Sequence, residues 1–244
     1  MKNQILEELA NRKSIRAFEE TGITLEERSS IITAAAMAPT AGCQQLYTIL
    51  DVTDEDLKKR LADLCDHQPF IARAKLLLVF CADCKKWYDA FSAAGCSPRR
   101  PGAGDLLLAV DDALIAAQNA VTAAESLGIG SCYIGDVMEN CEQMRDALHL
   151  PKYVFPAALL VFGRPTKQQK DRKKPRRIDE KYLVHENVYH PLSARELSDM
   201  LSDKADAKEY EAWLSAFCER KYNSEFAKEM SRSVELYLKD FLEE

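Results

Sequence analysis

Residues 105–128 read "DLLLAVDDALIAAQNAVTAAESLG" and form the longest helical pattern in the chain, which ends at Gly128. The polar positions 111, 118 and 125, together with 112, 119 and 126, repeat every seven residues. They mark a narrow polar stripe on a helix that is otherwise apolar. We expect this helix to lie inside the protein or between two copies of it.

Runs of apolar residues on both sides of this helix predict buried strands. Two are long and continuous, "KLLLVFCAD" at 75–83 and "FPAALLVFGRP" at 155–165, as is typical of strands buried on both faces. A shorter strand is predicted at 46–52 ("LYTILDV"), and a short strand followed by a turn is predicted at 130–137 ("GSCYIGDV"). Further helices are predicted at 3–12, at 24–38 and from about 54 to 65. Another is predicted after the segment 130–137, and it ends at about 148. The alternation indicates an α/β or α+β domain.

The C-terminal part has a different pattern. Residues 164–182 contain few apolar residues and predict a surface connection. Residues 193–242 are predicted to be helical, and a set of apolar residues there recurs every three or four positions, namely Phe226, Met230, Val234, Tyr237 and Phe241. This spacing predicts an amphipathic helix that docks on another surface. We therefore expect a domain over 1–192 and a helical extension over 193–244, packed on the same domain or on a dimer.

Composition limits the classes of function. The 244 residues are 47% hydrophobic, with a formal net charge of −6, so the whole protein offers no wide attractive field to nucleic acid or anionic lipid. No secretory signal is visible, and polar residues interrupt the apolar stretch at 106–127. These features predict a soluble, cytoplasmic protein that binds neither nucleic acid nor membrane.

The eight cysteines do not predict a metal site. Cys81 and Cys84 form the one closely spaced pair, and a second pair at ligand spacing is missing. Cys65 and His67 are conceivable partners, but free thiols are the expectation, with no metal.

Residues 11–20 read "NRKSIRAFEE" and gather three cations and a hydroxyl at Arg12, Lys13, Ser14 and Arg16. One interpretation is a solvated basic turn. The other is an anion site, because these side chains donate charge-assisted hydrogen bonds to a phosphate. The residues of this segment alone do not decide between the two.

Three segments taken together resemble the FMN-dependent nitroreductase family: "NRKSIRAF" at 11–18, "LGIGSCYIGDV" at 127–137 and "GRPTKQQKDRKKPRR" at 163–177. "MAPTAGCQQ" and "HQPFIARAKLLLVF" lie at the expected places between the first two. The resemblance covers roughly residues 1–190. It implies an α+β, nitroreductase-like fold, with a central mixed, mainly antiparallel sheet flanked by helices, and makes 1–192 an FMN-binding domain.

The resemblance also implies roles for particular residues. The first segment would grip the phosphate and ribityl chain of FMN, and Lys174 and Arg176 of "KKPRR" would add a second phosphate clamp. The turn Tyr133-Ile134-Gly135-Asp136 would pass beneath the isoalloxazine, with a backbone N–H donating to flavin N5. Gln68 would bond the polar edge of the flavin, with a surface amide as the alternative.

The loop at 39–45, including Pro39 and Thr40, resembles the family loop that reaches the flavin of the partner subunit. Cys43 stands where an Asn is common, and Leu46-Tyr47 replaces the frequent Pro-Trp. The usual amide is therefore missing from this contact, and the thiol of Cys43 is either an inert small hydrophobe or a group near the flavin.

The implied activity is a ping-pong oxidoreductase that takes hydride from NADH or NADPH through flavin N5. It would reduce an electron-poor acceptor such as a nitroaromatic or a quinone, and it would be a homodimer. No catalytic acid–base pair is expected, since the chemistry is the cofactor's. One alternative is a flavin carrier or redox sensor without robust turnover. The other, a nucleic-acid module built on "RKKPRR", is opposed by the acidic net charge.

Overall fold

The computed structural model describes residues 3–205 and 209–242 of the chain. They divide into two compact units. The sheet unit comprises the described residues up to Lys173 and from Glu229 on, and the helical unit comprises Lys174–Lys228. Each unit is described by itself.

The sheet unit is built on four strands in the order β1-β2-β4-β3, and every neighbouring pair is antiparallel. The strands are β1 (Tyr47–Asp51), β2 (Leu76–Asp83), β3 (Gly130–Ile134) and β4 (Val154–Gly163). β2 and β4 lie at the centre and are buried at every position, as their continuous apolar runs predict. The α+β class is confirmed.

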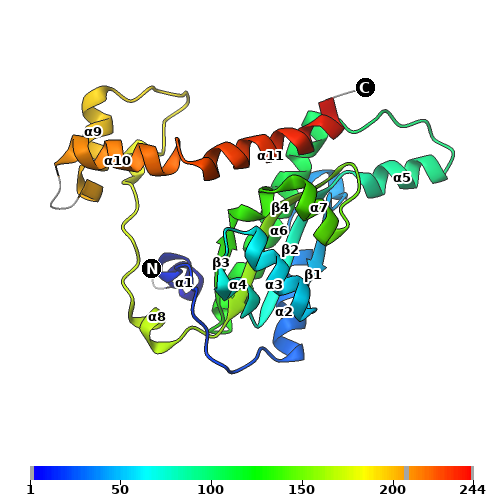
Figure 1. Cartoon of the computed structure of the whole chain (residues 1–244), viewed down its shortest axis with the longest axis horizontal. Coiled ribbons are helices and arrows are strands. Elements are labelled where there is room, and N and C mark those ends of the chain that lie inside the picture. Colours follow the sequence, from blue (N-terminus) through cyan, green and yellow to red (C-terminus); the bar gives the residue numbers. More distant parts are fainter. Residues whose placement is uncertain (1–2, 206–208, 243–244) are drawn as a thin grey trace. The chain divides into compact units, whose positions relative to one another are not determined.

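Helices cover both faces of this sheet (Figure 1). α6 (Ala103–Ser126) packs across all four strands, and α3 (Glu55–Leu64), α4 (Pro69–Ala72) and α7 (Cys141–Leu148) lie on the opposite face. The remaining elements of this unit are α1 (Gln4–Asn11), α2 (Leu25–Ala36), η1 (Ala41–Cys43), α5 (Lys85–Ala93), η2 (Gly135–Met138) and α8 (Lys167–Asp171).

Local sequence explains where these helices begin. Thr24 and Glu27 form a capping box at the start of α2, with side chain and backbone bonded reciprocally. Asp54 caps α3 by accepting from the backbone N–H of Leu57 at 2.7 Å. The α4 and α5 helices are short, and the sequence pattern did not predict them.

The predicted long helix is the core helix α6. It is long and apolar enough to cross a membrane by length and composition, but part of it is buried inside the protein. Core helices of soluble proteins can be equally long and apolar. The alanines of α6 that face the sheet are fully buried. Asp112, on the predicted polar stripe, is also buried, at 2% exposure.

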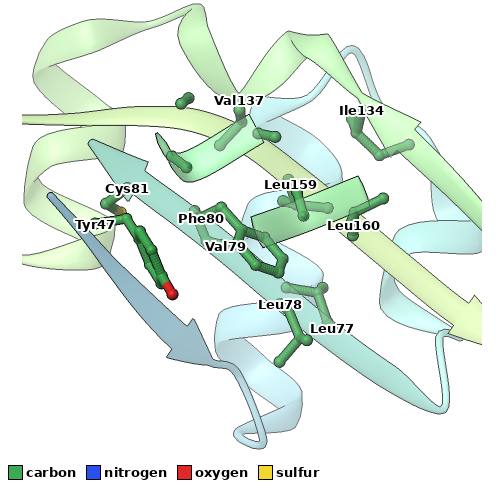
Figure 2. Packing of buried hydrophobic residues seen from close by; sticks show 14 of the residues in the cluster. Tyr47, Leu77, Leu78, Val79, Phe80, Cys81, Ile134, Val137, Leu159 and Leu160 are labelled. Atoms are coloured by element: carbon green, nitrogen blue, oxygen red, sulfur yellow. The ribbon is translucent and has the colours of Figure 1, made fainter. Parts of the chain in front are cut away.

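The core fills the space on both sides of the central strands. Figure 2 shows Val79, Phe80, Leu159 and Leu160 at its centre, with Ile134 at the end of β3. Those five side chains are 0–3% exposed. Burial on this scale supplies the main driving force for folding and fixes the sheet that carries the site.

The helix α11 (Glu225–Leu242) docks on the sheet unit with the apolar face that the sequence predicts. Tyr237 packs edge-on against Phe155, with ring centroids 5.1 Å apart. The hydroxyl of Ser233 accepts from the backbone N–H of Cys141 at 2.8 Å and donates to the carbonyl oxygen of Met138 at 2.7 Å. The helix therefore also fixes the chain that follows η2.

The helical unit contains η3 (Glu180–Tyr182), α9 (Ala194–Ala205), α10 (Tyr210–Lys221) and the start of α11. The predicted helical character of 193–242 is confirmed for its described residues. The predicted surface connection over 164–182 is mostly exposed, and it carries the short elements α8 and η3.

Candidate cofactor-binding site

The basic segment, which we define as Arg12–Arg16, lies along the edge strand β3. Ser14 pairs with Ser131 in a parallel bridge, and the backbone N–H of Ile15 donates to the carbonyl oxygen of Ser131 at 2.9 Å. A Cβ on Gly130 would lie 2.5 Å from the Ile15 side chain, so only glycine admits the segment this close. The basic segment is therefore mounted on the sheet rather than on a free turn.

The same segment continues across the end of β4. Phe18 forms a bridge with Pro165, and Glu19 donates its backbone N–H to the carbonyl oxygen of Arg164 at 2.8 Å. Gly163 meets the Phe18 ring where a Cβ would be only 2.6 Å away. Two glycines on neighbouring strands thus position one stretch of chain.

Lys13 joins the basic segment to α8. Its ammonium donates to the carbonyl oxygens of Lys170 at 2.6 Å and Arg172 at 2.5 Å. Arg172 in turn donates from Nη2 to the carbonyl oxygen of Ser14 at 2.5 Å. Arg172 therefore adds a fourth cation that the sequence did not single out.

Arg12 has hydrogen-bonding capacity that the described residues do not satisfy. Its guanidinium lies over the Tyr133 ring, 5.8 Å from the centroid. The Nε and Nη2 atoms are buried, and they have no hydrogen-bond partner among the described residues. A buried donor without a partner is costly, and a phosphate oxygen would satisfy it. Burial raises the pKa of Tyr133 to about 12, against the opposing charge of Arg12.

Arg16 also lies against an aromatic ring. Its guanidinium lies 6.0 Å from the Phe70 ring centroid, and its backbone N–H donates to Oε1 of Gln169 at 3.4 Å. Burial raises the pKa of the Cys132 thiol, while Arg16 and Ser14 act in the opposite direction. The basic segment and β3 therefore surround this thiol with donors.

The turn after β3 brings two predicted residues together. Gln68 donates from Nε2 to Oδ1 of Asp136 at 3.0 Å and to the carbonyl oxygen of Cys65 at 2.9 Å. Beside it, a Cβ on Gly135 would meet no described atom within 4 Å. Open space above a glycine backbone suits a flat ring. Ile134, the neighbour of Gly135, is 3% exposed and belongs to the core.

Glu139 follows this turn and is a buried acid. It is 4% exposed, and its Oε1 lacks a hydrogen-bond partner in the described part of the chain. Burial raises the pKa of this carboxyl to about 7, and the nearby carboxylates of Asp136, Asp66 and Glu229 add to the effect. Its backbone N–H donates to the carbonyl oxygen of Asp136 at 3.0 Å.

The loop 39–45 is held by the buried carboxylate of Asp112 on α6. Asp112 accepts from the Thr40 hydroxyl and from the backbone N–H groups of Ala41 at 2.8 Å and Leu46 at 3.0 Å. Pro39 is exposed at the start of the loop. The predicted contact of Pro39 and Thr40 with the flavin of a partner subunit stays a prediction.

The second predicted clamp lies in the helical unit. Lys174 is its first residue, and Arg176 forms ion pairs with Asp203 and, at 3.9 Å, with Asp179. The role of Lys174 and Arg176 toward a phosphate stays a prediction as well.

The described residues contain no group of three or more histidine, cysteine, aspartate or glutamate side chains that could hold a metal ion. Cys81 and Cys84 are buried free thiols, and burial raises the pKa of each to about 12.

The residues present fit FMN. A phosphate would find Arg12, Ser14 and Arg16 around Cys132, and two Arg12 nitrogens there have no hydrogen-bond partner among the described residues. A flat ring would find open space at Gly135 next to Gln68. The fold and the site thus indicate a cofactor-binding protein in which a basic segment, fixed to the sheet, would bind a phosphate group.

Comparison with known proteins agrees with this description. The model of the nitroreductase family matches residues 9–164. The FMN reductase (NAD(P)H) of Bacillus subtilis is 31% identical over 237 residues, which cover 96% of this chain and 91% of that protein. The oxygen-insensitive NADPH nitroreductase of Salmonella typhimurium is 37% identical over 194 residues, covering 79% and 78%.

Among solved structures, the NADPH:FMN oxidoreductase from Vibrio harveyi in complex with NAD+ is similar, with a TM-score of 0.82 and 27% identity. The similarity covers 97% of this chain and 98% of the chain in that structure. The chain belongs to the nitroreductase family. The resemblance drawn from the sequence is confirmed, as are the predicted FMN cofactor and the class of NAD(P)H-dependent oxidoreductase.

Proposed function

We propose that the protein is an FMN-dependent enzyme that transfers hydride from NADH or NADPH to a small, electron-poor organic acceptor. The observation that supports this most directly is Arg12, which lies on a segment fixed to β3. Its buried Nε and Nη2 atoms have no hydrogen-bond partner among the described residues. A flavin carrier without turnover is the weaker alternative, because the relatives are named as reductases.

The residues of the chain divide the task of holding FMN. Arg12, Ser14 and Arg16 bind the phosphate and ribityl chain, and Lys13 holds α8 beside them. Gln68, oriented by Asp136, faces the polar edge of the ring, and the backbone at Gly135 lies against it. Bound FMN supplies a group that accepts hydride from NAD(P)H and passes it to the acceptor. The protein contributes orientation and charge.

We further propose a cytoplasmic homodimer, as the resemblance implies. Two helices of the sheet unit expose large apolar side chains: Ile5, Leu6 and Leu9 on α1, and Leu107, Leu108, Leu114 and Ile115 on α6. Leu107 is 65% exposed, which is costly for a helix that otherwise forms the core. A second copy packed on these residues would remove that surface from water.

The test of the cofactor is an absorbance spectrum of the purified protein, with identification of the flavin released by denaturation. We expect FMN and anaerobic bleaching on addition of NADPH or NADH. A colourless protein that cannot be reconstituted with FMN would overturn the proposal.

Sedimentation of the FMN-loaded protein tests assembly. We expect the mass of a dimer at micromolar concentration. A monomer that retains FMN would contradict the dimer alone.

A further inference from the structure

Two cavities of the sheet unit differ in their chemistry. One, of about 390 Å³, lies between α5, the start of α6 and the end of the loop 39–46. We call it the aromatic cavity, because Trp87, Tyr88 and Phe91 of α5 line it. Its two charged lining residues, Arg99 and Asp105, pair with each other through two bonds of 2.6 and 2.9 Å. The aromatic cavity therefore carries no net charge.

The other cavity is strongly charged. It has a volume of about 470 Å³ and lies between residues 16–20, the start of α3 and residues 70–75. Six charged residues line it: Arg16, Lys58, Arg73, Lys75, Glu20 and Glu55. We call it the cationic cavity, because four cations against two carboxylates leave a net charge of +2. Its size falls within the range of about 300–1,000 Å³ for pockets that hold small organic ligands.

Ion pairing within the cationic cavity leaves two guanidinium groups over. Each lysine pairs with one of the carboxylates, at 2.8 and 3.0 Å. Among the described residues, Arg16 and Arg73 form no ion pair with a carboxylate. A guanidinium group offers donors in a planar fork that matches the oxygens of a phosphate. The cationic cavity therefore has unused capacity for an anion.

Lys58 shows that this cavity reaches into the protein. The residue is only 8% exposed, although it carries an ammonium group. The side chain of its partner Glu55 is 68% exposed, so water weakens the attraction between them. A charge withdrawn from water beside other charges of the same sign is costly. An anion bound in the cavity would offset this cost.

The apolar part of the lining suits an organic group attached to such an anion. Phe18 and Phe70 are half-buried and line the cavity. The Arg16 guanidinium lies 6.0 Å from the centroid of the Phe70 ring, so charge and ring face are close together. An aromatic base carrying a phosphate would contact both.

The cationic cavity is distinct from the proposed phosphate site of FMN, although Arg16 belongs to both. Arg12, Ser14 and Cys132 do not line it. Arg73 lines it and has no proposed role toward FMN. A change at Arg73 therefore acts on the cationic cavity alone.

We propose that the cationic cavity binds a small phosphorylated molecule, with Arg73, Lys58 and Arg16 as donors to its phosphate group. This site goes beyond the proposed function and does not depend on it. Inorganic phosphate and nucleotides share the chemistry that the donors recognise. A nucleotide would add ring contacts with Phe70, whereas inorganic phosphate would use the cations alone.

Calorimetric titration of the FMN-loaded full chain, in a chloride buffer, tests this site with inorganic phosphate and 5′-AMP as probes. Bound FMN fills its own phosphate site, so the titration reports on the cationic cavity. We expect saturable binding with a Kd of about 1 mM or tighter. Arg73→Ala should weaken it about tenfold or more, because a charge-assisted bond to phosphate is lost.

Lys59→Ala is the matched control. Lys59 follows Lys58 on α3, pairs with Asp56 at 2.8 Å and does not line the cavity. The variant loses the same charge as Arg73→Ala and should change the Kd by less than about twofold. Arg73→Lys keeps the charge without the fork and should fall between the parent and Arg73→Ala. Because Arg73 is exposed, its variants should keep the melting temperature of the parent.

Tighter binding of 5′-AMP than of phosphate would support a nucleotide as the ligand, and equal binding would support free phosphate. Unchanged affinity in Arg73→Ala, or an equal loss in Lys59→Ala, would overturn the site. Adenosine that binds as tightly as 5′-AMP would overturn the assignment to an anion. A protein that cannot take up FMN, yet binds phosphate in a way that Arg73→Ala weakens, would remove the proposed function and leave the anion site standing.

Discussion

The basic segment and the aromatic cavity solve two recognition problems in opposite ways. The basic segment gathers Arg12, Lys13 and Arg16 within five residues. A backbone bond fixes it to β3, and the Lys13 ammonium bonds carbonyl oxygens at α8. The aromatic cavity gathers apolar rings on one short helix and cancels its one pair of formal charges internally.

The difference follows from what each site would hold. A phosphate is strongly hydrated, so a protein that removes its water must offer several fixed donors in return. An uncharged aromatic ring loses little on leaving water and needs only shape and apolar surface. One region of the molecule is therefore charged and fixed by hydrogen bonds to β3 and α8, while the other carries no net charge.

The largest expected effect comes from removing the mount of the basic segment. Gly130→Ala would place a Cβ 2.5 Å from Ile15 and force the segment off β3. We expect a loss of about 1–3 kcal/mol in the free energy of unfolding, as for other overpacked sites, together with loss of FMN. Thermal denaturation and flavin content measure the two effects.

Gly104→Ala is the control for this change. Gly104 lies within α6, where a Cβ would meet no described atom within 4 Å. It should be neutral or stabilising by up to about 1 kcal/mol. Similar results for the two alanine variants would show that the close approach of Ile15 to β3 does not position the site.

Removing a single cation should separate FMN binding from folding. Arg16 is exposed, so Arg16→Ala should leave the melting temperature of the apoprotein nearly unchanged. A charge-assisted bond to phosphate or to the flavin edge is worth about 1.5–3 kcal/mol, a ten- to hundredfold loss in FMN affinity. Titration of apoprotein with FMN measures it.

Lys174→Ala extends the same test to the predicted second clamp. We expect a similar loss of FMN affinity. Retention of full affinity in Lys174→Ala, with loss in Arg16→Ala, would confine the phosphate grip to the basic segment and α8.

The sequence predicts the basic segment but not the aromatic cavity. The helix α6, the strands β2 and β4 and the capping box at Thr24 are local patterns, and the basic segment is visible because its charges are adjacent. The aromatic cavity depends on α5, a helix of nine residues. Trp87 and Phe91 are four residues apart, which is the one local signal that could have found it.

Long-range partners explain what the sequence could not predict. Asp112 belongs to the narrow polar stripe that the sequence predicts, but the pattern does not show that it is buried and accepts three hydrogen bonds from the loop 39–46. Arg172 reads as one surface cation among many, but it reaches a carbonyl 158 residues away, that of Ser14. Such pairings form only when the sheet brings distant segments together.

A smaller effect should appear as a pH dependence near the cofactor site. The pKa of Glu139 rises to about 7 in the folded protein, from 4.5. The folded state therefore binds more protons than the unfolded state between these values, and stability falls as pH rises from about 4.5 to 7. Glu139→Gln keeps the shape and cannot ionise. It should gain about 1–2 kcal/mol relative to the parent at pH 8 and nothing at pH 4.

Chemical denaturation across pH 4–8 measures this difference. Glu142→Gln is the control, because Glu142 is exposed and ion-paired with Arg232. A stability profile of Glu139→Gln parallel to the parent would show that the carboxyl is not held away from its usual pKa.

The smallest effect is expected at Lys167. This variant tests whether the affinity for FMN depends on the positions of particular donors or on the total charge of the basic segment and α8. Lys167 is an exposed cation at the start of α8, three residues from Lys170, whose carbonyl oxygen Lys13 holds. If the region attracted FMN through its summed charge, each lost cation would weaken binding alike, and more so at low salt. If fixed donors bind the phosphate, Lys167→Ala should change FMN affinity and stability by less than about 0.5 kcal/mol, as at other solvated positions. FMN titrations of Lys167→Ala and Arg16→Ala at low and high salt compare the two accounts, since both variants lose one positive charge. Equal losses in both would mean that the basic segment acts as a diffuse field, and its mounting on β3 would then serve the fold alone.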